Sequence, residues 1–197
     1  MEISILILIC SLSLSLAIEE PKYEVLKQLG SNMEIRRYPA TKWVSTKVET
    51  MAKDVSNNMM FGKLFNYISG VNSENQKIEM TAPVLMEYVN KESKMIEKSS
   101  TVSVSMNFYI PSLFKNNTPQ PTANDVLIRE VPEMIVAVAK FGGYASLDDY
   151  LTNRDSLLRT LGPDAQKYDS MNLMTAGYNS PFTLLFRRNE VWLKKLN

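Results

Sequence analysis

The sequence predicts an α+β domain of two similar halves, in which a distorted antiparallel β-barrel or sheet is flanked by two long helices. Two repeated segments carry the prediction of an internal duplication. Met80-Thr81-Ala82 recurs as Met174-Thr175-Ala176, 94 positions later. Residues 35–39 (IRRYP) resemble residues 128–132 (IREVP) at an offset of 93. Similar landmarks at nearly one offset indicate that the same structural unit occurs twice.

Strand patterns occur in both halves. Each repeated segment is followed by a β-rich run, residues 42–48 in the first half and 134–139 in the second. In residues 101–110, apolar side chains alternate with polar ones, which predicts a strand with one buried face. Residues 184–193 are typical of a strand, a brief turn and a continuing strand.

Two helices are predicted from apolar residues at helical spacing. The first covers about residues 54–69 and ends at Gly70. The second covers residues 146–161, with Ser146 as the expected N-cap. Each helix leads to one MTA segment. We therefore expect both MTA segments to be strands that hold equivalent places about a pseudo-twofold axis.

Length and charge are those of an ordinary globular protein. The chain has 197 residues, with 22 basic and 21 acidic residues and a formal net charge of +1. We expect one domain over residues 18–197, with halves at about 22–110 and 125–195. The charged residues form no basic stripe, so the sequence indicates no nucleic-acid partner.

The first 17 residues are typical of a secretory signal peptide. Residues 3–16 are apolar or serine, small residues precede a cleavage point after Ala17, and polar sequence begins at Glu19. We therefore expect a secreted or secretory-lumen protein, monomeric and without a membrane span in the mature chain. An uncleaved amino-terminal anchor is the alternative.

The chain contains no histidine, and its single cysteine, Cys10, lies in the predicted signal peptide. A Ser-His-Asp triad, a histidine base and imidazole ligands to a metal are therefore excluded. Loss of Cys10 on cleavage would also exclude thiolate chemistry. We expect a protein without enzymatic activity and without a dedicated metal site.

The sequence resembles the SOUL haem-binding protein family. The matching segments are YEV at 23–25, EIRRY at 34–38, KWVST at 42–46, KIEMTAPV at 77–84, FGGY at 141–144, AGY at 176–178 and RNEVWL at 188–193. They occur in the family's order and span nearly all of the chain beyond residue 22. The resemblance implies a duplicated, distorted β-barrel with two helices that binds haem or another tetrapyrrole non-covalently in an apolar groove.

The chain departs from the family at two kinds of position. Arg37 stands where some members carry a histidine ligand. Asn58, Asn66 and Thr183 stand where basic residues of other members are proposed to meet the propionates. The resemblance therefore implies a site without a histidine ligand.

The groove is expected beside the first helix. Met59, Met60 and Phe65 are adaptable apolar side chains that could contact a flat macrocycle, although they could equally pack the helix on the sheet. Arg37 and Lys63 could pair with propionates or could be solvated surface charges. These five residues are the predicted ligand-binding residues.

Iron ligation is a further possibility. Met80 and Met174 could offer thioethers, and Tyr67, Tyr109 and Tyr178 could offer phenolates. The recurrence of the methionines at repeated positions favours a structural role instead, and tyrosines are more often half-buried with a bonded hydroxyl.

Two interpretations remain beside haem binding. The domain could keep the fold and serve as a protein-interaction or structural module. A family member also uses a helix corresponding to residues 147–159 to engage apoptotic regulators, although Gly162-Pro163 here does not reproduce the small-acidic pair that this mode needs.

Overall fold

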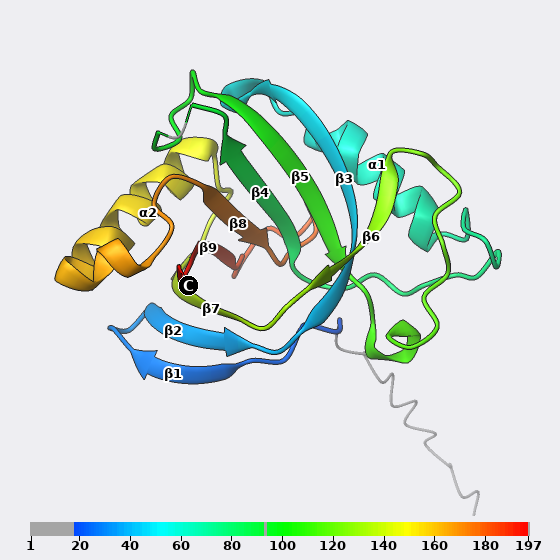
Figure 1. Ribbon diagram of the computed structural model, residues 1–197, viewed down its shortest axis with the longest axis horizontal. Helices are drawn as coiled ribbons and strands as arrows, with labels where there is room; N and C mark the ends of the chain where they lie inside the picture. The colour runs from blue at the N-terminus through cyan, green and yellow to red at the C-terminus, as the bar shows by residue number, and fades with distance from the viewer. Residues whose placement is uncertain (1–17, 93, 197) are drawn as a thin grey trace, which may run out of the picture.

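A nine-stranded antiparallel sheet, curled into a half-barrel, forms the body of the protein (Figure 1). The computed structural model describes residues 18–92 and 94–196, so the predicted signal peptide lies outside the described residues. The strands are β1 (Glu24–Gln28), β2 (Met33–Tyr38), β3 (Thr41–Met51), β4 (Val84–Asn90), β5 (Thr101–Tyr109), β6 (Val126–Val131), β7 (Met134–Phe141), β8 (Leu173–Gly177) and β9 (Asn189–Lys194). The predicted α+β class is confirmed.

The strand order is β1-β2-β7-β9-β8-β4-β5-β3-β6. From β2 to β6 this order is symmetric about its centre. Exchanging β2, β3, β4 and β5 with β6, β7, β8 and β9, respectively, gives the same order read from the other end. The centre of this order lies between β8 and β4, and the two proposed halves also pair through β2 with β7 and through β3 with β6. The symmetry of the order agrees with a duplication, which itself stays a prediction.

The MTA segments do not occupy equivalent places. Met174-Thr175-Ala176 lies inside β8, but Met80-Thr81-Ala82 precedes β4 and is not a strand. Thr81 donates its hydroxyl hydrogen bond to the Tyr109 carbonyl at 2.7 Å. The expectation of two MTA strands was therefore wrong for the first one, because loop contacts rather than a strand ladder fix this segment.

Two helices lie outside the curl of the sheet (Figure 1). Helix α1 (Asn57–Ile68) packs on β3 and β5, and α2 (Leu147–Leu161) packs on β7 and β9. Ser146 caps α2 as predicted, in a reciprocal capping box with Asp149. The first helix starts later than predicted because residues 52–54 form a separate 3-10 turn.

Both faces of the sheet are covered. Val44, Met106 and Phe108 belong to the main core under the helices, whereas Tyr38, Trp43 and Trp192 belong to a second core on the concave face. In β5 the polar residue Asn107 is therefore as buried as its apolar neighbours. The prediction of one buried face was incomplete because the curl encloses the other face as well.

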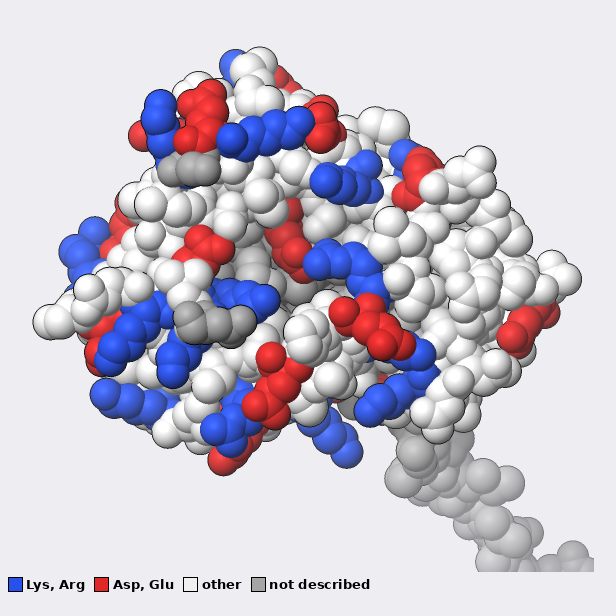
Figure 2. Space-filling model, viewed as in Figure 1, with Lys and Arg blue, Asp and Glu red and all other residues white. Residues whose placement is uncertain are grey.

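Charged side chains are scattered over the face that looks into the curl, with both signs interspersed (Figure 2). No helix among residues 18–92 and 94–196 combines the length and apolar character needed to cross a membrane.

Candidate functional site

An apolar cavity of about 480 Å³ opens on the outer face of the sheet, between the starts of α1 and α2. We call it the outer-face groove. Its lining residues are Asn57, Asn58, Phe61, Val84, Met86, Tyr88, Met106, Ala145, Tyr150, Thr175, Gly177, Asn179, Ser180, Pro181 and Phe182. Its volume lies in the range of small-molecule sites.

The floor of the groove comes from the centre of the sheet. Met86 in β4 lies between Met106 in β5 and Thr175 in β8 in the strand register. Side chains alternate between faces along a strand, so these three point to the same outer face. The floor therefore offers flexible thioether side chains, which adapt to irregular or flat ligands.

Aromatic side chains form part of the walls. Phe61 on α1 lies 5.1 Å from the Phe108 ring and stacks at 5.8 Å on Phe65. Tyr150 enters from α2, and Phe182 enters from the loop between β8 and β9. The groove thus has aromatic groups from both helices and from the loop.

The base of that loop is fixed by hydrogen bonds. Arg187 donates from Nη1 to the Ser180 carbonyl at 2.7 Å and to the Thr183 carbonyl at 2.9 Å. Its guanidinium lies 4.4 Å from the centre of the Tyr144 ring. The Arg188 N–H donates to the Asn179 side chain at 2.6 Å. These contacts hold the segment against the body of the domain.

The tip of the loop is apolar and exposed. Phe182, Leu184, Leu185 and Phe186 are exposed by between 71% and 98%. The sequence pattern predicted a strand here, but β9 begins only at Asn189. The first part of the predicted strand is absent, because the apolar side chains of residues 184–186 face outward instead of entering a core. The continuing strand corresponds to β9.

Two tyrosines in the groove have altered acidity. Burial raises the pKa of Tyr88 to about 12. Burial, with the nearby Tyr88 as a smaller cause, raises the pKa of Tyr150 to about 12. Both side chains are therefore neutral phenols at physiological pH and not the phenolates that ligate iron strongly.

The amino terminus of α1 borders the groove. Ser56, at its N-cap position, makes no side-chain capping bond. Asn57 and Asn58 in the first turn line the groove. Uncapped N–H groups and the helix dipole favour negative charge, so this end of the groove suits a carboxylate better than the apolar floor does.

Four of the five predicted ligand-binding residues lie on α1. Met59 and Phe65 are exposed on the helix, whereas Met60 is fully buried in the main core. Lys63 pairs with Asp125, with Nζ and Oδ2 at 2.5 Å. None of these four lines the outer-face groove directly, although Phe65 stacks on Phe61, which does.

Arg37 lies on β2, away from α1 (Figure 1). Its guanidinium pairs with Glu24 at 3.0 Å and with Glu133 at 3.8 Å. The structure therefore does not bring Arg37 together with the other predicted residues.

The five possible iron ligands also lie elsewhere. Tyr67 donates to the Pro119 carbonyl, and Tyr178 donates to Glu190. Met174 and Tyr109 pack against the concave core, and Met80 packs against the main core. Among the described residues, no group of three or more Asp, Glu, His or Cys side chains could hold a metal ion.

The residues that build the groove were not predicted from the sequence. Met86, Met106, Tyr150 and Phe182 come from β4, β5, α2 and the loop before β9. The exposed apolar run at 182–186 was the only local signal, and it resembled a buried strand.

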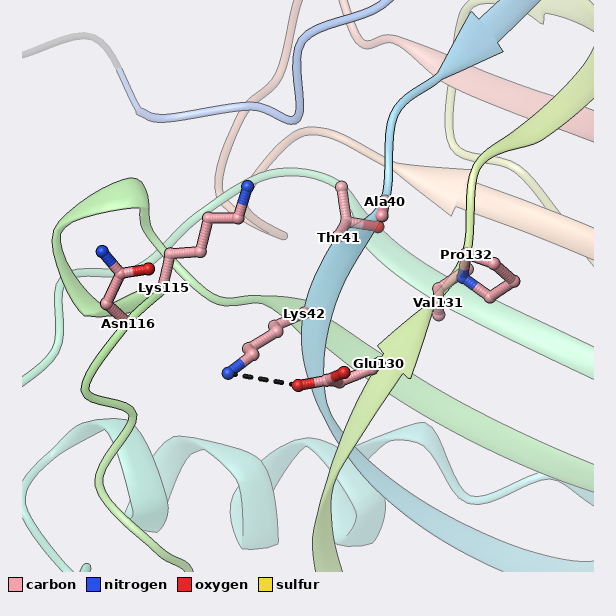
Figure 3. Close-up of a pocket in the computed structure, with 8 residues that line it drawn as sticks. All are labelled: Ala40, Thr41, Lys42, Lys115, Asn116, Glu130, Val131 and Pro132. Atoms are coloured by element: carbon pink, nitrogen blue, oxygen red, sulfur yellow. Dashed lines mark ion pairs between the residues drawn. The ribbon is translucent and has the colours of Figure 1, made fainter.

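A second, larger cavity lies at the start of β3 (Figure 3). Lys42, Lys115 and Glu130 are among its lining residues, and Lys42 pairs with Glu130 at 3.3 Å. This cavity is more open and more polar than the outer-face groove. It fits a flat apolar ligand less well.

The family model for SOUL heme-binding protein matches residues 18–194. The chain belongs to the SOUL haem-binding protein family. Heme-binding protein 2 of Homo sapiens is 40% identical over 184 residues, which are 92% of this chain and 88% of the relative. Heme-binding protein 1 of Xenopus laevis is 32% identical over 168 residues, which are 85% and 86% of the two chains.

Solved structures of distant proteins have a similar fold. The C-terminal domain of EcmrR superposes with a TM-score of 0.56 at 13% identity and covers 88% of this chain and 99% of that domain. An uncharacterised conserved protein from Listeria innocua gives a TM-score of 0.56 at 7% identity, covering 82% and 91%. At such low identity these likenesses concern the fold alone.

Proposed function

We propose that the protein binds haem or another tetrapyrrole non-covalently in the outer-face groove and has no enzymatic activity. The observation that carries this proposal is the apolar, methionine-floored cavity between two helices in a chain of the SOUL family. A tetrapyrrole is a flat apolar plate with carboxylates at one edge. The groove offers apolar walls for the plate and an uncapped helix start for a carboxylate.

The iron would have no strong protein ligand. The sequence has no histidine, and burial raises the pKa of both groove tyrosines to about 12. Met86 and Met106 offer thioethers, which are weaker ligands to ferric iron than imidazole. Binding would therefore rest on burial of the macrocycle, with little contribution from the iron.

We also propose that residues 1–17 are removed and that the mature protein is a secreted monomer starting at Ile18. The apolar run and the small residues before Ala17 support this. The residues just beyond the proposed cleavage point contact the domain. Glu19 accepts a hydrogen bond from the Ser112 N–H at 2.9 Å, and Glu20 pairs with Arg188 at 2.5 Å.

Titration of the purified protein with hemin tests the binding proposal. A saturable, sharpened and shifted Soret band is the expected result. A spectrum that never departs from that of free hemin would instead favour the rival function, a protein-interaction module that keeps the fold. Amino-terminal sequencing of secreted material tests the second proposal, and a sequence starting at Met1 on intracellular protein would overturn it.

A further inference from the structure

A further hollow lies on the concave face of the sheet, opposite the outer-face groove. We call it the concave hollow. It has a volume of about 290 Å³, and its lining residues are Ser45, Lys47, Glu87, Val89, Ser103, Ser105, Leu127 and Arg129, from β3, β4, β5 and β6. Figure 2 shows this face hollowed near its middle, with acidic and basic side chains at the rim. The groove proposed for tetrapyrroles uses none of these residues.

A buried amide organises the base of the concave hollow. Asn107 is almost fully buried and accepts a hydrogen bond from the Ser45 hydroxyl at 2.6 Å. Its amide nitrogen donates to the Leu85 carbonyl at 3.0 Å. Arg129 donates from Nη1 to the Asn107 oxygen at 3.1 Å. These bonds fix the position of the Arg129 guanidinium.

Several donors around the hollow are left without a protein partner. Arg129 uses only Nη1, for Asn107 and for Glu87 at 3.2 Å, so its Nε and Nη2 make no hydrogen bond to the described residues. Ser103 is 8% exposed, yet its hydroxyl bonds to none of residues 18–92 and 94–196. Lys47 is exposed on β3 and forms no ion pair within the same part of the chain. None of these donors is a buried atom without a partner, so all of them are open to water or to a ligand that enters the hollow.

The charge balance indicates which ligand fits. Among the lining residues, the two cations Lys47 and Arg129 face one carboxylate, Glu87, which Arg129 already contacts. A second carboxylate near Lys47, Glu49, is paired with Lys91 at 2.6 Å. The excess is one positive charge among hydroxyl donors. Guanidinium and hydroxyl donors around a positive centre are the groups that bind carboxylates and phosphates.

We propose that the concave hollow is a binding site for a small oxyanion, a carboxylate or a phosphate group, held by Arg129, Lys47 and the Ser103 hydroxyl. Val89 and Leu127 lie partly exposed at its edge and would contact the carbon part of an organic anion. The site is independent of the tetrapyrrole proposal because it lies on the other face of the sheet.

Nuclear magnetic resonance titration of the purified protein tests this proposal, with inorganic phosphate and butyrate as separate probes. The expected result is saturable shifts of the backbone amides at 45–47, 87–89, 103–105 and 127–129 with at least one probe. Tighter binding of butyrate would indicate an organic carboxylate, and tighter binding of phosphate a phosphate group. Shifts elsewhere only, or no saturation with either probe, would overturn the proposal.

Two variants locate the anion without leaving a buried charge. Ser103→Ala and Lys47→Met should each weaken the binding by about tenfold, as expected for loss of one hydrogen bond to a charged group. Lys53→Met removes an equal charge from an exposed position outside the hollow and should change the affinity by less than about twofold. Equal weakening by Lys47→Met and Lys53→Met would mean non-specific attraction and would contradict the site. Hemin binding should be unchanged in all three variants, so this test is separate from that of the tetrapyrrole groove.

Discussion

Arg36 and Glu190, which are 154 positions apart in the sequence, form a bidentate ion pair on the concave face of the sheet. Arg36 Nη1 lies 2.9 Å from Glu190 Oε2, and Nη2 lies 3.0 Å from Oε1. Both side chains are only 1% exposed. Tyr178 and Trp192 also donate to Glu190, at 2.8 and 2.7 Å. The pair thus joins β2 and β9, which lie on either side of β7 in the sheet.

Glu190→Gln should lower the free energy of unfolding by about 3 kcal/mol, because it leaves the buried Arg36 guanidinium without its main counter-charge. Urea unfolding followed by tryptophan fluorescence measures this change. Glu24→Gln is a matched control, since Glu24 pairs with the exposed neighbour Arg37. It should cost less than about 1 kcal/mol. Similar losses in the two variants would contradict the importance of the buried pair.

The stability should also fall in acid through Glu34. Burial alone would raise the pKa of Glu34, but hydrogen bonds from Lys140, Arg36 and Gln28 outweigh it and hold the pKa below its ordinary value of 4.5. The unfolded chain then binds this proton more readily than the folded protein does. The contribution of Glu34 to the free energy of unfolding is fully present above the pKa that Glu34 has in the unfolded chain. It is lost as the pH falls through the lower pKa that Glu34 has in the folded protein. Urea midpoints measured from pH 7 to pH 3 should therefore decline below about pH 4.5. The decline should be shallower in Glu34→Gln, and an identical pH profile for the variant would contradict this assignment.

Local patterns predicted much of the fold. Ser146 and Asp149 predicted the start of α2 because a capping box is a short-range device. The alternation around Met106 predicted β5 because side chains of a strand alternate between faces. Asn107 showed the limit of that pattern, since only the curl of the whole sheet buries it.

The groove could not be predicted in the same way. Met86 and Met106 become neighbours only through strand pairing, and Tyr150 and Phe182 arrive from later parts of the chain. Phe186 illustrates a second difficulty. An apolar run predicts burial, but the sequence does not say whether the run packs into the core or forms a ligand-binding surface. The Phe186 side chain is 98% exposed.

Phe182→Asp should weaken hemin binding by about tenfold or more, because Phe182 would lose apolar contact with the macrocycle. Its side chain is 90% exposed in the free protein, so the fold should survive. Phe186→Asp introduces the same charge in the same loop at a residue that does not line the groove. It should change the hemin affinity by less than about threefold. Absorption titration of both variants with hemin measures the difference. Equal losses of affinity would show that hemin does not bind in the outer-face groove.

Replacement of the two predicted cationic residues should matter little. Arg37 is paired with Glu24 and Lys63 with Asp125, so neither charge is free for a propionate. Arg37→Ala and Lys63→Ala should each change the hemin affinity by less than about threefold. Phe65→Asp should weaken it more, since this ring supports Phe61 at the wall of the groove. A large loss of hemin affinity in either alanine variant would show that the replaced residue does take part in binding.

Iron-free protoporphyrin should bind within about tenfold of hemin. Burying some 300 Å² of apolar surface would contribute roughly 7 kcal/mol before the costs of association, which is most of the available binding energy. The phenols of Tyr88 and Tyr150 keep their protons because burial raises the pKa of each to about 12. Met106→Leu should therefore leave the Soret band in place, since it removes a thioether while nearly preserving the volume of the floor. Fluorescence quenching of the two tryptophans measures both ligands on one scale. Two results together would contradict this account: hemin binding several orders of magnitude tighter than protoporphyrin binding, and a Soret band that shifts in Met106→Leu. They would demonstrate that Met106 ligates the iron.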